Sequence, residues 1–166
     1  MAMRIVVAGM GNLLRGDDGF GVVVAQRLLG KPVPEGVTVM EVGIGGIHMV
    51  QALLDRTDGL IVLDAVDLGR RPGTIVVIQP EVRDVASLSL SERHDELADM
   101  HYATPSRAFM LARGLDILPA ATWLVGCQPV DAESYGEGLS PEVQNAIETA
   151  IAEVKALVTS MGVSWS

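Results

Sequence analysis

Strand and helix patterns alternate along the first 67 residues, and this alternation limits the possible folds more than any other feature. Residues 4–8 (RIVVA) form a short β-branched run that a glycine ends, which is typical of a buried central strand. A helical apolar face follows over residues 17–30, and strand, helix and strand patterns succeed one another at 37–43, 46–55 and 59–67. Such alternation predicts parallel strands joined by right-handed crossovers.

The remaining residues complete one sheet and its covering helices. Residues 73–79 follow a turn too short to hold a crossover helix, so we expect this strand to be antiparallel or at an edge. Residues 104–115 and 140–161 predict helices with well-defined starts, and residues 121–129 predict the last strand. Residues 80–103 are polar and fit no regular pattern beyond one short helix. We therefore predict a three-layer α/β/α sandwich, phosphorylase/hydrolase-like, with a mostly parallel twisted sheet of about five strands.

Composition indicates one domain and excludes several classes of partner. The chain has 166 residues, 49% of them hydrophobic, which suits a single catalytic domain over residues 1–166. Its net charge of −9 would repel nucleic acid and anionic membranes. Cys127 is the only cysteine, so no intramolecular disulfide can form and a reducing cytoplasm is the expected compartment. We expect a monomer with no signal peptide and no transmembrane segment.

The glycine-rich stretch GMGNLLRGDDGFG, residues 9–21, stands where a dinucleotide-binding protein has its fingerprint. Gly9 and Gly11 fit that fingerprint, but Leu14 occupies the position of its third glycine. Glu41 stands near the end of the second strand, where a carboxylate would bind a ribose. Asp17 and Asp18 would compete with a pyrophosphate at the helix start. A non-catalytic dinucleotide-binding module therefore remains only an alternative.

We expect different roles for the two aspartates of this stretch, Asp17 and Asp18. Asp17 is expected to cap the helix, because aspartate is favoured at that position. Asp18 is rotated from it by roughly 100° and can face the space beyond the strands. Asp64 ends the apolar strand LIVL and needs a partner or a metal if it is buried. Ligands of open α/β sheets bind at the carboxyl ends of strands, so we expect Asp18 and Asp64 to meet there.

Three histidines are candidates for a third group. His48 lies in the second predicted helix, where packing or surface exposure would explain it, and His94 is surrounded by charged residues in SERHDELAD. His101 directly precedes a helix start on a segment that must pass near the sheet edge. Two carboxylates and an imidazole suit a divalent ion with open coordination positions. A carboxylate pair acting as acid and base is the other possibility.

The chain resembles the nickel–iron hydrogenase maturation endopeptidases, which remove a C-terminal extension from the hydrogenase large subunit once nickel is inserted. The motifs that carry the resemblance are, in chain order, GMGNLLRGDDGFG, EVGIGG, LIVLDAV, DMHYATPSRAFMLA and LVGCQP. They cover nearly the whole domain. The chain departs from the family where residues 41–44 replace a frequent Asp-Gly-Gly-Thr, and where Asp18 replaces a frequent glutamate.

The resemblance implies a site formed by Asp18, Asp64 and His101, which would serve both as metal ligands and as catalytic residues. His94 is the competing match for the histidine. The nickel would be carried by the substrate, the precursor of the large subunit, and would act as the recognition element for cleavage. A general metallohydrolase holding its own divalent ion at the same residues is the second hypothesis.

Overall fold

The computed structural model describes residues 2–43, 46–82, 91 and 104–166, and it places five strands in one sheet. The sheet order is β2-β1-β3-β5-β4. The strands are β1 (Ile5–Met10), β2 (Val37–Gly43), β3 (Gly59–Ala65), β4 (Ile75–Ile78) and β5 (Ala121–Cys127). All neighbours pair in parallel except β4, which runs antiparallel to β5 at the edge. The predicted mostly parallel sheet with one antiparallel edge strand is thus confirmed.

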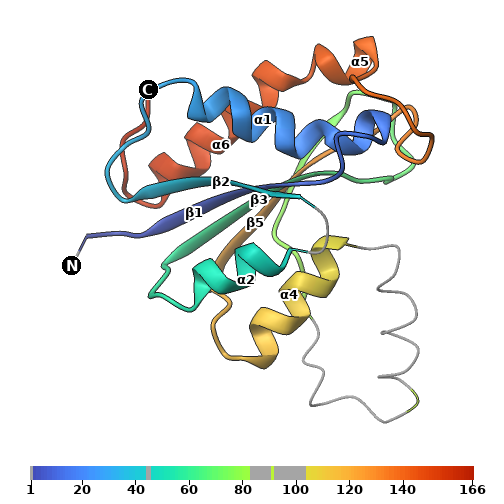
Figure 1. The fold of residues 1–166 in the computed structure, drawn as a ribbon. Helices are drawn as coiled ribbons and strands as arrows, with labels where there is room; N and C mark the ends of the chain where they lie inside the picture. The colour runs from blue at the N-terminus through green and yellow to red at the C-terminus, as the bar shows by residue number, and fades with distance from the viewer. Residues whose placement is uncertain (1, 44–45, 83–90, 92–103) are drawn as a thin grey trace.

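Helices cover both faces of the sheet and give the three layers that the sequence predicts. One face is covered by α1, α5 and α6, and the opposite face by α2 and α4 (Figure 1). The helices are α1 (Phe20–Leu29), α2 (Ile47–Leu53), α4 (Thr104–Gly114), α5 (Pro141–Gln144) and α6 (Ile147–Ser160), and a 3-10 turn, η1 (Gly16–Gly19), precedes α1.

Each face of the sheet has its own apolar core, because alternate residues of a strand point to opposite faces. In β1, Ile5 and Val7 pack toward α1 and α6, whereas Val6 and Ala8 pack with residues of α2 and α4. β1 and β3 are buried along almost their whole length. This burial on both faces explains why their sequences are continuous apolar runs and do not alternate.

Two glycines let α1 lie directly on the sheet. A Cβ at Gly9 would collide with the carbonyl oxygen of Gly21, and it would lie 2.7 Å from the Cβ of Ala25. A Cβ at Gly21 would collide with the carbonyl oxygen of Leu63. Gly9 and Gly21 therefore allow close packing of β1 and β3 against α1. That packing sets the distance between the turn before α1 and the end of β3.

Two helix boundaries differ from the sequence prediction. The helix expected from residue 17 begins at Phe20, because Gly16 has a φ of 53° and residues 16–19 form a 3-10 turn instead. The helix expected over residues 140–161 is interrupted between α5 and α6. The irregular segment 80–103 lies outside the described residues except at 80–82 and 91.

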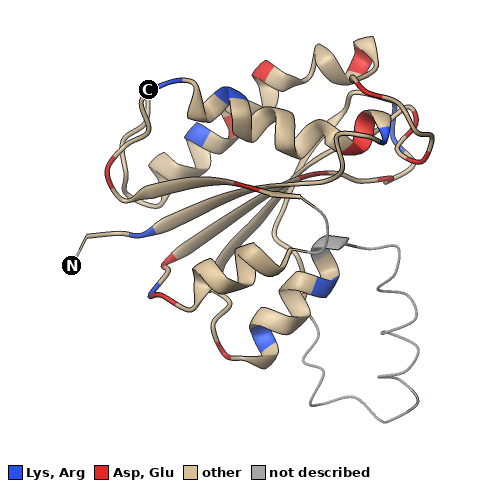
Figure 2. Cartoon of the chain, in the orientation of Figure 1, with Lys and Arg blue, Asp and Glu red and all other residues tan. Residues whose placement is uncertain are grey.

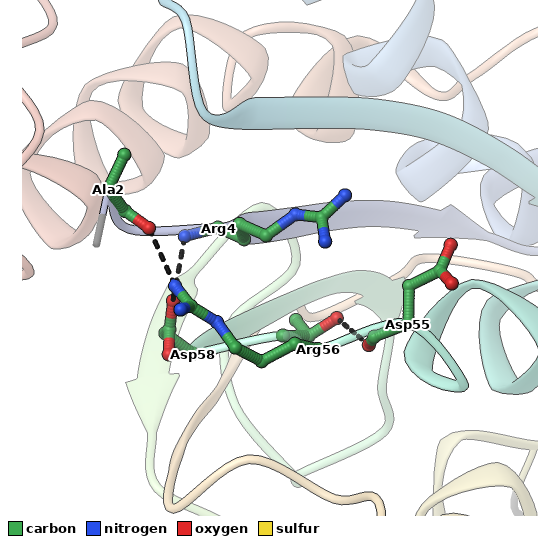
Figure 3. A network of polar contacts seen from close by, with 6 residues as sticks. Ala2, Arg4, Asp55, Arg56 and Asp58 are labelled. Carbon is green, nitrogen blue, oxygen red and sulfur yellow. Dashed lines mark hydrogen bonds and ion pairs between the residues drawn. The ribbon is translucent and has the colours of Figure 1, made fainter.

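A network of polar contacts ties the strands together at their amino ends (Figure 3). Asp58, just before β3, accepts hydrogen bonds from the backbone N–H of Arg4 at 2.9 Å and from Nη2 of Arg56 at 2.7 Å. Nη2 of Arg56 also donates to the carbonyl oxygen of Ala2 at 2.6 Å. These partners lower the pKa of Asp58, first through the Arg4 N–H and then through Arg56. The network joins the start of β1 to the start of β3.

Candidate active site at the carboxyl edge of the sheet

Two carboxylates meet at the opposite, carboxyl edge of the same strands. Gly9 of β1 pairs with Leu63 of β3, so the two strands end level with each other. Asp64 follows Leu63, and Asp18 lies on η1, in the connection that leaves β1. The negative charge of Asp18 raises the pKa of Asp64, which places the two groups within electrostatic reach. The sequence expectation that these residues share one edge agrees with this arrangement.

Asp64 is a buried carboxylate without a full set of partners. Its residue is only 4% exposed, and its Oδ1 accepts no hydrogen bond from any described residue. Burial raises its pKa well above the ordinary value, and the charge of Asp18 raises it further, against a smaller lowering by the N–H of Ala65. A buried carboxylate oxygen that finds no donor among the described residues is costly for a fold, so Oδ1 of Asp64 indicates a position that a proton or a cation completes.

Asp18 is half-buried and held by the turn that carries it. Its Oδ2 accepts a hydrogen bond from the backbone N–H of Asn12 at 2.9 Å. Burial raises its pKa, while the Asn12 hydrogen bond and the charge of Arg15 lower it. Gly11, with a φ of 131°, passes so close that a Cβ there would collide with the carbonyl oxygen of Asp18 and lie 3.8 Å from Oδ1 of Asp64. A glycine at this position therefore lets the backbone pass between the two aspartates.

Asp17 does not cap the helix, and the sequence prediction is wrong on this point. No side chain of the described residues caps η1 or α1, and Asp17 instead reaches across to the loop of residues 128–140. Its carboxylate accepts hydrogen bonds from the N–H groups of Val130 at 2.8 Å, Asp131 at 3.3 Å and Ser140 at 2.7 Å, and from the Ser140 hydroxyl at 2.9 Å. The residue is 1% exposed. Asp17 therefore joins the turn that carries Asp18 to a distant loop.

Backbone hydrogen bonds strengthen this junction. The N–H of Gly16 donates to the carbonyl oxygen of Gly136 at 2.8 Å, and the N–H of Gly136 donates to that of Leu14, also at 2.8 Å. No role for this loop was expected from the sequence. Its signal was a glycine-rich irregular stretch, YGEGLS, between Pro129 and Pro141, and such stretches are often functional.

The described part of the chain adds no histidine to Asp18 and Asp64 as a third metal ligand. His101 and His94, the two candidates for a third ligand, both lie outside the described residues. His48 is described and is exposed on α2. Among the described residues, no group of three acidic, histidine or cysteine side chains could hold a metal ion. The two carboxylates suit a hard or borderline cation and need at least one further ligand to complete its shell.

Two other candidate residues, Cys127 and Glu41, do not support a cysteine nucleophile or a dinucleotide site. Cys127 is buried in β5, and burial, with a smaller effect of Asp17, raises the pKa of its thiol to about 12, so it is not an activated nucleophile. Glu41, the residue a dinucleotide site would need, accepts a hydrogen bond from Nε2 of Gln26 at 2.6 Å. These contacts argue against a cysteine nucleophile and against the dinucleotide alternative.

The architecture is an open α/β sheet with two carboxylates at the carboxyl ends of its parallel strands, where ligands of such sheets bind. The family model of the hydrogenase maturation proteases matches residues 22–157. The chain belongs to the hydrogenase maturation protease family, and it is a peptidase. The resemblance inferred from the sequence motifs is therefore confirmed.

Individual relatives agree over almost the full chain. The hydrogenase expression/formation protein HupD of Rhodobacter capsulatus is 32% identical over 161 residues, which are 96% of this chain and 73% of that protein. A putative hydrogenase maturation protease of Methanocaldococcus jannaschii is 32% identical and covers 89% of this chain and 91% of its own. The solved structure of the hydrogenase maturating endopeptidase HybD from E. coli is 28% identical with a TM-score of 0.75, and the match covers 98% of this chain and 96% of that one.

Within residues 2–43, 46–82, 91 and 104–166, no helix is both long and apolar enough to cross a membrane.

Proposed function

We propose that this protein removes the C-terminal extension from the precursor of a nickel–iron hydrogenase large subunit after nickel has been inserted. In this proposal the nickel in the precursor is the recognition element, and Asp18, Asp64 and His101 bind it. The same three residues form the catalytic site. Membership of the hydrogenase maturation protease family supports the substrate class.

The observation that carries this proposal is the buried Oδ1 of Asp64, which has no hydrogen-bond partner among the described residues. A neighbouring carboxylate at Asp18 makes the position unfavourable for a second negative charge and favourable for a cation. A precursor that contains nickel offers such a cation, whereas an empty precursor offers only a peptide. The difference in binding free energy between the two then restricts cleavage to the nickel-loaded precursor.

Cleavage in this proposal is a hydrolysis. A water molecule adds to the scissile carbonyl carbon, the peptide C–N bond breaks, and the leaving amine takes up a proton. In this proposal Asp18 and Asp64 orient that water and hold or release the proton, and substrate-bound nickel polarises the carbonyl. Burial raises the pKa of Asp64, so a proton and a cation compete for its carboxylate.

The experiment is processing of the cognate precursor with and without nickel, followed by mass spectrometry of the large subunit. We expect loss of the extension only from the nickel-loaded precursor. Cleavage at equal rates in both samples would disprove recognition through nickel. His101→Ala is expected to abolish processing and His94→Ala to leave it intact, and the reverse result would transfer the ligand role to His94.

A metallohydrolase with its own divalent ion is the second candidate, because the same unpartnered oxygen of Asp64 could bind a resident ion. Metal analysis of the purified protein distinguishes the two. A stoichiometric, tightly held ion that survives dialysis would favour the resident metal, and its absence together with nickel-dependent cleavage would favour the first proposal.

We further propose that residues 1–166 act as a single catalytic domain, as a monomer in the cytoplasm. One sheet includes all five described strands, and both site aspartates come from the same chain, which supports this view. A single buried cysteine is consistent with a reducing compartment.

A further inference from the structure

Apolar side chains are exposed beside the aspartate pair, on the two segments that Asp17 joins. Leu13 is 41% exposed and Leu14 56%, both in the connection between β1 and η1. Val130 is 53% exposed and Tyr135 80%, both in the loop of residues 128–140. We call these four residues the apolar patch. Single exposed apolar residues are ordinary on protein surfaces, but clusters on adjacent segments mark interaction sites.

Hydrogen bonds hold the two segments of the patch together. The N–H of Gly136 donates to the carbonyl oxygen of Leu14, so Tyr135 and Leu14 lie on juxtaposed backbones. The N–H of Val130 binds the carboxylate of Asp17, the residue next to Asp18. The patch therefore belongs to the same hydrogen-bonded unit as η1, the turn that carries Asp18, and a molecule that covers the patch lies next to that turn.

Tyr135 is fixed although it is exposed. The guanidinium of Arg15 lies over its ring, 5.0 Å from the ring centre, and Nη2 of Arg15 donates to the tyrosine hydroxyl at 3.2 Å. The N–H of Leu14 is bonded to Oδ1 of Asn12 at 2.9 Å, which fixes the turn that presents both leucines. Side chains that are ordered before binding lose little entropy when a partner covers them, and aromatic anchors of this kind dominate many interfaces.

Acidic residues border the patch. Glu133 and Glu137 are exposed in the same loop, and neither forms an ion pair with a described residue. Figure 2 shows acidic residues on this loop and on η1. A partner with complementary charge would present lysine or arginine beside its apolar side chains.

We propose that the apolar patch is the docking surface for the precursor protein, and that it binds a segment of apolar residues flanked by basic ones near the cleavage site. This inference rests on the proposed function, because it assumes that the protein substrate approaches Asp18 and Asp64. Docking on the patch brings the chain of the precursor to the aspartates, whichever metal is bound there.

The test compares two double variants with wild type on the nickel-loaded cognate precursor. Leu14→Ser with Tyr135→Ser removes the centre of the patch. Leu29→Ser with Leu54→Ser is the matched control, because these leucines are 49% and 65% exposed. Leu29 is the last residue of α1 and Leu54 directly follows α2, so both lie at the carboxyl ends of their helices, away from the aspartates. Equal melting temperatures verify that both variants are folded.

We expect the patch variant to raise KM about tenfold or more with little change in kcat, and the control to match wild type. Binding of the same precursor to immobilised protein should weaken by a similar factor, which gives a readout that needs no cleavage. A further variant, Glu133→Gln with Glu137→Gln, should weaken binding about threefold at low salt and not at high salt.

Two outcomes would contradict the docking proposal, and a third would contradict only the proposed function. Equal KM values and equal binding for the patch variant and its control would exclude docking at the patch. A wild-type dimer that the patch variant alone dissociates, in sedimentation experiments, would assign the patch to contacts between two copies of this chain. Precursor that binds the patch but is never cleaved by wild type would disprove the proposed function while leaving the docking surface intact.

Discussion

Strand β3 has an aspartate near each end, and the two have opposite surroundings. Asp58 precedes the strand, is partly exposed and accepts hydrogen bonds from Arg4 and Arg56 that lower its pKa. Asp64 is the next-to-last residue of the strand, is buried beside another carboxylate, and has its pKa raised well above the ordinary value. The same residue type therefore stabilises the fold at one end and opposes it at the other.

This difference supports the proposal that Asp64 is a functional carboxylate, whereas Asp58 is a structural one. A fold gains from an aspartate that finds cations and N–H groups, as Asp58 does. A buried aspartate that finds another carboxylate costs stability, so its retention needs a benefit outside the fold. Asp17 is a third case, because it is as deeply buried as Asp64 but fully engaged by the loop of residues 128–140.

Asp64→Asn should have the largest effect, and it tests the functional side of the comparison. We expect processing of the precursor to fall about a thousandfold or more, because the neutral amide can neither bind a cation nor hold the catalytic proton. Stability should change in the opposite direction. The carboxyl ionises at its ordinary pKa of 3.8 in the unfolded chain and at a higher pKa in the folded protein, so its ionisation at neutral pH opposes folding.

Calorimetry at two pH values measures this effect of Asp64→Asn. The melting temperature should exceed that of wild type near neutral pH, and the difference should disappear at about pH 3, below both pKa values. A variant that is equally destabilised at both pH values would show that Asp64 stabilises the fold as Asp58 does.

Asp17→Ala should have the next largest effect, and it separates burial from function. The substitution leaves three N–H groups and a hydroxyl without their acceptor, so the free energy of unfolding should fall by about 3–5 kcal/mol. Urea denaturation measures the loss. Ser140→Ala, which removes only the hydroxyl, serves as the control and should cost about 1 kcal/mol. Equal losses from the two variants would mean that Asp17 does not hold the loop.

The same aspartates show how far the sequence predicts this protein. The sheet and its antiparallel edge strand follow from local patterns, since β-branched runs predict buried strands and a short turn before β4 excludes a crossover. The shared edge of Asp18 and Asp64 follows from the parallel strands alone. These predictions need only residues that lie close together in the sequence.

The partner of Asp17 could not be predicted in this way. Its carboxylate accepts hydrogen bonds from Val130 and Ser140, which lie 113 and 123 positions further along the chain. An aspartate before a helix has the same local sequence pattern whether it caps that helix or not. The unpartnered oxygen of Asp64 is likewise a property of packing, because the sequence shows a strand-ending acid but not how many donors reach it. Long-range satisfaction of polar groups thus decides which acid is structural.

Asp58→Asn should have the smallest effect, and it tests the structural side of the comparison. The substitution removes the charge that Arg56 contacts at the amino edge, where water screens the interaction, so we expect a small decrease in melting temperature near neutral pH. The folded pKa of Asp58 lies below the unfolded value of 3.8, so its contribution is complete above that value and is lost as the pH falls through the folded pKa. Wild type and variant should therefore converge once the pH is below the folded pKa of Asp58, and high salt should also reduce the difference. Processing activity measured near neutral pH should remain at the wild-type level, because Asp58 lies at the opposite edge of the sheet from Asp64. A loss of activity comparable to that of Asp64→Asn would mean that the two ends of β3 do not divide stability and function as proposed.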